Sequence, residues 1–179
     1  MKKIDILLAL VCLTACGYHL GTGSLASRYQ TISVPYVKGD SEGIMTAALI
    51  EKVSTQSMIR YTNTDGDLLL KVCIDKPKGR NIGFRYAPKN SKVVVANEGR
   101  LTQTATVTLV DCENCCTVLG PFEVTAIFDY DFEPDMGTVN QHAFSLGQLE
   151  MNSLAKDAAT PALHNLLAEK IVDYVNNSW

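Results

Sequence analysis

The stretch FEVTAIFDYDF, residues 122–132, decides the fold class of this 179-residue chain. Its even positions hold apolar or aromatic residues, and every odd position except that of Ile127 is polar. Alternation with a period of two residues is typical of a β-strand that buries one face. The stretch therefore predicts a half-buried strand, which ends at the turn-forming residues Pro134, Asp135 and Gly137.

A second β-rich segment, residues 92–110, directly precedes this strand. In its last part apolar residues alternate with threonines, which suits a half-buried strand. The side chains expected to point inward are Leu101, Ala105, Val107 and Leu109, and those expected to point outward are Thr104, Thr106 and Thr108. The polar sequence DCENCC, residues 111–116, separates the two segments, so we expect an antiparallel hairpin around this turn.

The rest of the chain supplies further strands and the helices. Strands are expected at residues 29–37, 58–61 and 67–74. Apolar residues at spacings of three and four predict a helix at 41–56 and two helical stretches, 146–159 and 160–176, that meet at a kink or break at Pro161. This order predicts an α+β fold, a two-layer sandwich with two helices on one face of a mixed or antiparallel sheet of about four strands.

The N-terminus carries the signals for export. Lys2 and Lys3 precede an apolar run that is far shorter than the roughly 20 residues of a transmembrane helix. The sequence LTAC, residues 13–16, resembles the bacterial lipobox. It predicts that residues 1–15 are a lipoprotein signal peptide and that Cys16 carries a diacylglycerol and an N-acyl chain. The alternative is an ordinary cleaved signal that contains two cysteines.

The domain organisation follows from this signal. Residues 16–28, rich in Gly, Ser and Thr, are expected to form the acylated cysteine and a flexible tether, and residues 29–179 a single periplasmic α+β domain. Gly17 stands where lipoproteins of the inner membrane typically carry Asp, so the resemblance to known sorting patterns favours the outer membrane of a Gram-negative bacterium. A net charge of −3 argues against nucleic acid as a partner.

Four cysteines of the mature domain are candidates for disulfides: Cys73, Cys112, Cys115 and Cys116. A zinc site needs four ligands, but the chain has no second Cys-x-x-Cys and its histidines are scattered. A redox motif needs a helix N-terminus, whereas three of these cysteines lie in the predicted turn. We therefore expect at least one structural disulfide after export and no metal. Free or intermolecularly paired thiols, and metal or redox chemistry, are the alternatives.

A basic stretch with few acidic residues lies in the middle of the chain, with Phe84 and Tyr86 interleaved. Arg and Lys side chains are the residues that hold phosphates and carboxylates. The candidate ligands of an anionic lipid are Lys76, Lys78, Arg80, Arg85, Lys89, Lys92 and Arg100. The alternative is a solvated basic loop that binds nothing.

The sequence lacks three common catalytic signatures. Gly-x-Ser-x-Gly, His-Glu-x-x-His and a glycine-rich phosphate loop are all absent. The carboxylates at 129, 131, 133 and 135 alternate along a strand, as on a solvated face. We therefore expect no catalytic residue and no cofactor beyond the lipid on Cys16.

The sequence CGYHL, residues 16–20, resembles the mature start of the lipopolysaccharide-assembly lipoprotein family, LptE, and the order of elements is similar over nearly all the mature chain. The resemblance implies a domain that plugs the outer-membrane barrel LptD and assists barrel assembly and lipopolysaccharide transport, without catalysis. The cysteine-rich turn departs from the family pattern, and residues 122–132 hold no basic residue. The implied lipopolysaccharide contact therefore falls on residues 76–100. Two alternatives remain, a disulfide-crosslinked structural envelope lipoprotein without a transport role and a lipid-anchored enzyme.

Overall fold

The computed structural model describes residues 24–87, 90–132 and 146–177, so the predicted signal peptide, Cys16 and Lys89 lie outside the described residues. The helices are α2 (Ser24–Arg28), α3 (Ile44–Gln56) and α4 (Leu146–Asn177). The strands are β1 (Thr31–Ser33), β2 (Arg60–Thr62), β3 (Leu68–Ile74), β4 (Lys78–Ala87), β5 (Asn90–Asp111) and β6 (Cys116–Asp131).

Strand β5 is the centre of one mixed, six-stranded sheet. On one side it pairs with β6, and on the other it pairs with β4 near its start and with β3 near its end, always antiparallel. Strand β1 pairs in parallel with both β2 and β3, which gives the order β2-β1-β3-β5-β4. The predicted hairpin is confirmed, because Asp111 pairs with Cys116 and Thr104 with Thr125.

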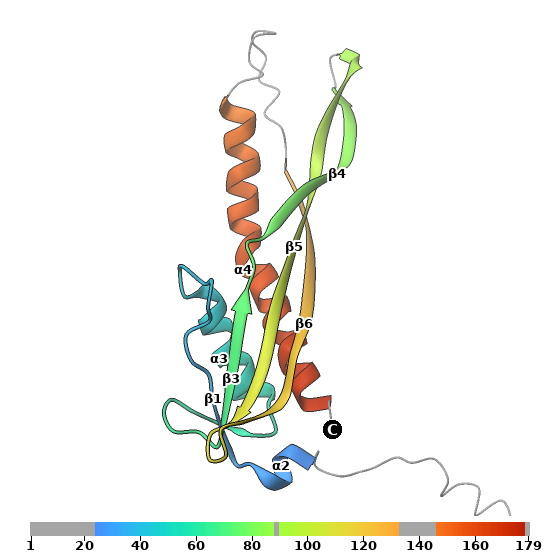
Figure 1. The fold of residues 1–179 in the computed structure, drawn as a ribbon. Coiled ribbons are helices and arrows are strands. Elements are labelled where there is room, and N and C mark those ends of the chain that lie inside the picture. The colour runs from blue at the N-terminus through green and yellow to red at the C-terminus, as the bar shows by residue number, and fades with distance from the viewer. Residues whose placement is uncertain (1–23, 88–89, 133–145, 178–179) are drawn as a thin grey trace, which may run out of the picture.

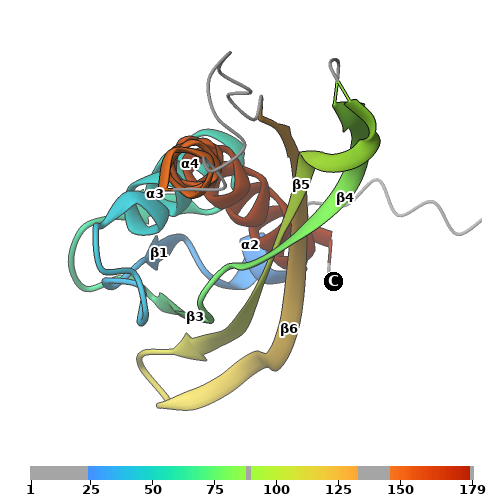
Figure 2. The same cartoon turned by 90° about the horizontal axis from the view of Figure 1, so that it is seen from above.

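The α+β fold with helices on one face of the sheet is also confirmed. Helices α3 and α4 lie against the same face of the sheet (Figures 1 and 2). The core between the helices and the sheet contains buried residues of both layers, and those of β5 are the ones that its alternation predicted. They are Leu101, Ala105, Val107 and Leu109 of β5 and Leu163, Leu167 and Ile171 of α4. Burial of each leucine or isoleucine side chain contributes roughly 1.5–3 kcal/mol. This apolar layer therefore fixes which face of the sheet is left open.

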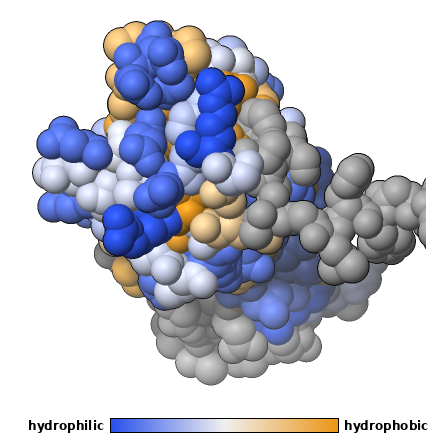
Figure 3. Space-filling model, turned by 90° about the horizontal axis from the view of Figure 1, so that it is seen from below, coloured by the Kyte–Doolittle hydropathy of each residue, from blue (hydrophilic) through white to orange (hydrophobic). Residues whose placement is uncertain are grey.

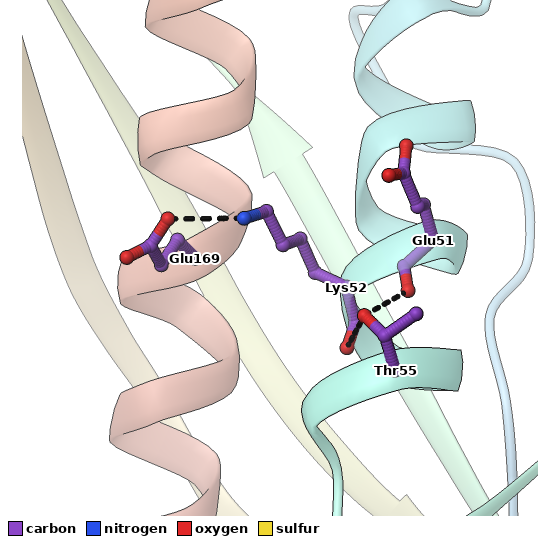
Figure 4. A network of polar contacts seen from close by, with 4 residues as sticks. All are labelled: Glu51, Lys52, Thr55 and Glu169. Carbon is purple, nitrogen blue, oxygen red and sulfur yellow. Dashed lines mark hydrogen bonds and ion pairs between the residues drawn. The ribbon is translucent and has the colours of Figure 1, made fainter.

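The two long helices are also joined by a polar contact. Lys52 of α3 reaches Glu169 of α4 at 3.0 Å, and Thr55 donates a hydrogen bond to the carbonyl of Glu51 (Figure 4). Because both charged side chains are partly exposed to solvent, the ion pair contributes at most about 1 kcal/mol. The apolar contacts therefore dominate the packing of α3 on α4.

Three details differ from the expectations. The two predicted tail stretches form one helix, α4, which continues through Pro161 and changes direction near its middle (Figure 1). Residues 24–28, expected to belong to the tether, form α2, whose Leu25 is buried in the core. The sheet has two more strands than the four expected, and the basic stretch supplies one of them as β4. None of the helices in the described residues is long and apolar enough to cross a membrane.

Candidate functional site

The sheet face opposite α3 and α4, called the open face below, is not covered by any helix within the described residues (Figures 1 and 2). It carries the even-numbered residues of β5, because successive side chains of a strand point to opposite faces. A threonine stripe runs along its middle, made of Thr102, Thr104, Thr106 and Thr108. The hydroxyl of Thr104 lies 3.0 Å from that of Thr125 on β6. The open face is therefore rich in hydroxyl groups.

Charges of opposite sign flank the threonine stripe. Residues paired across neighbouring strands lie side by side on one face, so the pairing defines rows across the sheet. One row runs Lys38, Cys73, Thr106, Glu123. The exposed cations on the β1, β3 and β4 side are Lys38, Lys71, Lys78 and Arg80, and the exposed carboxylates on the β6 side are Glu123, Asp129 and Asp131. The open face therefore has a basic flank and an acidic flank.

Arg100, on the central strand, is held by the acidic flank. Its guanidinium donates two hydrogen bonds to the Asp129 carboxylate, at 2.6 and 2.7 Å. These bonds lower the pKa of Asp129, and the positive charge of Arg80 acts in the same direction. Of the predicted phosphate ligands, Arg100 is therefore already engaged within the sheet, whereas Lys78 and Arg80 are exposed beside it.

Strand β4 and the first part of β5 form a hairpin that extends past the body of the sheet, called the projecting hairpin below (Figure 1). Phe84, Tyr86 and Val94 on it are 62%, 67% and 55% exposed. Because Tyr86 pairs with Val94, and Phe84 lies two residues before Tyr86, the three share one face. Two register shifts lie between Arg80 and Phe84, so this apolar cluster lies further along the strand that carries Lys78 and Arg80, but alternation does not place it on the open face with them.

The remaining predicted basic residues do not gather at one place. Lys76 is exposed in the connection between β3 and β4, and Lys92 is exposed on the projecting hairpin. Arg85 pairs with the buried Val95, and two register shifts separate it from Lys78 and Arg80. The sequence could not reveal this separation, because register shifts within β4 decide which residues share a face.

The four candidate cysteines are exposed, and the structure forms no disulfide between them. Cys73 lies five residues beyond Leu68, which pairs with Asp111 at the turn, so it is roughly 17 Å along the strand from the turn. A disulfide needs α-carbons within about 7 Å. The structure therefore does not bring Cys73 to the turn, and a disulfide among the turn cysteines stays a prediction. No group of three metal-ligating residues occurs within the described residues.

Sequence reasoning missed the residue that organises the cysteine turn, Asp111. Its buried carboxylate accepts hydrogen bonds from the amides of Glu113 and Asn114, from the Asn114 side chain and from the Tyr29 hydroxyl, at 2.8 to 3.0 Å. These bonds, the Asn114 side chain foremost, lower the pKa of Asp111 from 3.8 to about 2. The carboxylate thus ties the turn to the start of the domain.

We expect Asp111 to make the domain sensitive to acid. Its folded-state pKa is below its ordinary value, so its stabilising effect is full above about pH 4 and is lost as the pH falls toward 2. Asp111→Asn should lower the urea midpoint at pH 7 and flatten its decline between pH 4 and pH 2. Glu113→Gln, which removes an exposed charge from the same turn, is the control. Parallel declines in Asp111→Asn and wild type would contradict this role.

The sequence of this chain matches a family model, and its fold is similar to that of solved structures. The family model described as LptE, lipopolysaccharide-assembly, matches residues 29–178. Rare lipoprotein B from Shewanella oneidensis superposes with a TM-score of 0.53 at 12% identity, over 83% of this chain and 96% of that one. A putative lipoprotein from Caulobacter crescentus CB15 gives 0.53 at 12% identity, over 88% and 97%. These likenesses show a shared fold. No curated protein matches the sequence.

Proposed function

Since this chain belongs to the LptE family of lipopolysaccharide-assembly proteins, we propose that it is an outer-membrane lipoprotein that partners and plugs the LptD β-barrel. In this role it assists the assembly of the barrel and the transport and insertion of lipopolysaccharide at the outer membrane. The observation that carries the proposal is the extent of the family match, which includes all six strands of the sheet together with the whole of α3 and α4. The role needs no catalytic group, and we propose none.

The projecting hairpin supports direct contact with lipopolysaccharide. This ligand combines phosphate groups with acyl chains, so its site needs cations beside an apolar surface. Lys78 and Arg80 supply exposed cations that can hold phosphates. Phe84, Tyr86 and Val94 supply the exposed apolar surface next to them. The cations and the two aromatic side chains lie along the same strand, β4, and Val94 pairs with Tyr86, so one extended amphipathic ligand can reach both kinds of side chain.

The end of the molecule away from the projecting hairpin supports attachment of the protein to the membrane through the lipid on Cys16. Helix α2 lies at the end away from the projecting hairpin (Figure 1), and residues 17–23 connect it to Cys16. Seen from this end, hydrophilic residues cover most of the visible described surface, and hydrophobic residues form only small patches (Figure 3). Such a surface offers little apolar area for membrane binding. Acyl chains on Cys16 would supply the anchor instead.

Co-purification tests the proposed partnership. The tagged, acylated protein should recover a large β-barrel from native outer membranes in mild detergent, because enclosure in a lumen buries roughly 2,000 Å² or more. Mass spectrometry of the recovered material identifies the barrel. Recovery of the tagged protein alone, from membranes that contain the barrel, would refute the proposal.

The alternative function, a disulfide-crosslinked structural envelope lipoprotein, is favoured by one observation. All four cysteines of the described domain are exposed and available for bonds to other chains. This function predicts disulfide-linked oligomers on a non-reducing gel of membranes alkylated before lysis. A barrel complex without such oligomers would favour the LptD partner instead.

A further inference from the structure

The open face is convex. Seen along the molecule, β3, β5, β6 and β4 follow an arc, and α3 and α4 lie on its inner side (Figure 2). The buried side chains of β5 point to that inner side, so the even-numbered residues line the outer side of the arc. A convex surface makes broad contact only with a concave partner. A second copy of this chain would present another convex face and touch it along a narrow strip.

The chemistry of the open face indicates a polar partner. Its central part consists of the exposed or half-buried hydroxyls of Thr104, Thr106, Thr108 and Thr125. The exposed large apolar residue nearest to them is Ile127, 47% exposed, on the next row toward the projecting hairpin. Such a surface gains little from contact with acyl chains. It suits a wall lined with polar side chains, which is what the interior of a large membrane barrel offers.

The charges of the open face give the contact an orientation. The row through Thr106 begins with Lys38 and ends with Glu123, and Lys71 lies on the basic flank in the row of Thr108. Strand β6 contains no Lys or Arg along its 16 residues, so the acidic flank stays acidic along its length. Because the two flanks carry opposite charges, the open face binds a charged wall more favourably in one orientation than in the orientation that exchanges the two flanks.

We infer that the part of the open face from the Thr104 row to the Thr108 row packs against the inner wall of the barrel partner. Wall carboxylates face Lys38 and Lys71, and wall cations face Glu123. The inference rests on the proposed function and adds to it the face that meets the barrel. The rows of Lys78 and Arg80 lie beyond this contact, at the start of the projecting hairpin, and stay accessible to an anionic ligand.

Site-specific photo-crosslinking tests the contact in the full-length, acylated protein. A photoreactive amino acid replaces Thr106, at the centre of the open face, or Asp173, an exposed position of α4. We expect the Thr106 position to crosslink to the barrel with a several-fold higher yield than the Asp173 position. Equal yields, a higher yield from Asp173, or a crosslinked dimer of this chain from Thr106 would each overturn the inference.

The same strains separate this inference from the proposed function. If the tagged protein still recovers the barrel in detergent while Thr106 fails to crosslink, the assigned face is wrong and the partnership stands. If neither position crosslinks and no barrel is recovered, the partnership itself fails, and the inference fails with it.

Charge reversal provides a second measurement that does not depend on crosslinking chemistry. Glu123→Lys and Lys71→Glu should each reduce barrel recovery several-fold, because each places a like charge against the wall. Glu51→Lys, at an exposed position of α3, is the matched control and should recover the barrel as wild type does. Circular dichroism confirms that each variant is folded. Wild-type recovery by both open-face variants would contradict the contact.

Discussion

Cys16→Ala is expected to move this protein from the membrane fraction to the soluble fraction in cells that lack the barrel. Each buried methylene of an acyl chain contributes about 0.8 kcal/mol, so two or more chains hold a protein on a membrane almost irreversibly. Within the described residues no helix can cross a membrane in their place. The domain should still fold, because its core is formed by residues from Leu25 onward. Fractionation followed by a high-salt wash measures the change.

Cys12, which lies within the predicted signal peptide, provides the control. Cys12→Ala leaves the lipobox cysteine in place, and it should keep the protein in the membrane fraction. Using cells without the barrel matters, because a barrel partner would retain the unacylated domain by protein contacts alone. If Cys16→Ala still sediments with washed membranes in those cells, the lipid-anchor assignment is wrong.

The parts of the fold that the sequence predicted are those decided by local patterns. The alternation in residues 122–132 predicted β6 because half of this strand's side chains face buried apolar residues. Helix α3 was predicted from its apolar spacing, and Asp40, just before it, accepts hydrogen bonds from the amides of Gly43 and Thr46. In both cases the residues that form the element also carry its signal.

The parts that the sequence did not predict depend on contacts between distant residues. Strand β4 contains Gly79, Gly83 and several charged residues, and its pairing with β5 includes register shifts, so it shows no clear alternation. The candidate site could not be predicted from the sequence for the same reason. The basic residues lie close together in the sequence, but two register shifts separate Arg80, which pairs with Arg100 on the open face, from Arg85. Lys38 joins the basic flank only through its pairing with Cys73, 35 positions along the chain.

Reversing the charge of both Lys78 and Arg80 is expected to weaken lipopolysaccharide binding strongly. A hydrogen bond to a charged group contributes roughly 1.5–3 kcal/mol, and about 1.4 kcal/mol corresponds to a tenfold change in affinity. Losing two phosphate contacts should therefore lower the affinity by a factor of about 100 or more at low salt. Arg80 lies beside Arg100, whose charge is already held by Asp129, so Arg100 does not replace it. A binding assay at several salt concentrations measures the loss.

The salt dependence and a matched variant decide whether these two cations form the site. Binding of the wild type should weaken as salt screens the phosphates, whereas the residual binding of Lys78→Glu with Arg80→Glu should depend less on salt. Arg60→Glu changes an exposed arginine on β2, away from the projecting hairpin, and should bind as wild type does. Barrel recovery should be retained in the double variant, since both residues lie outside the rows assigned to the wall. Wild-type affinity and salt dependence in the double variant would instead mean that this part of β4 is solvated and binds no ligand.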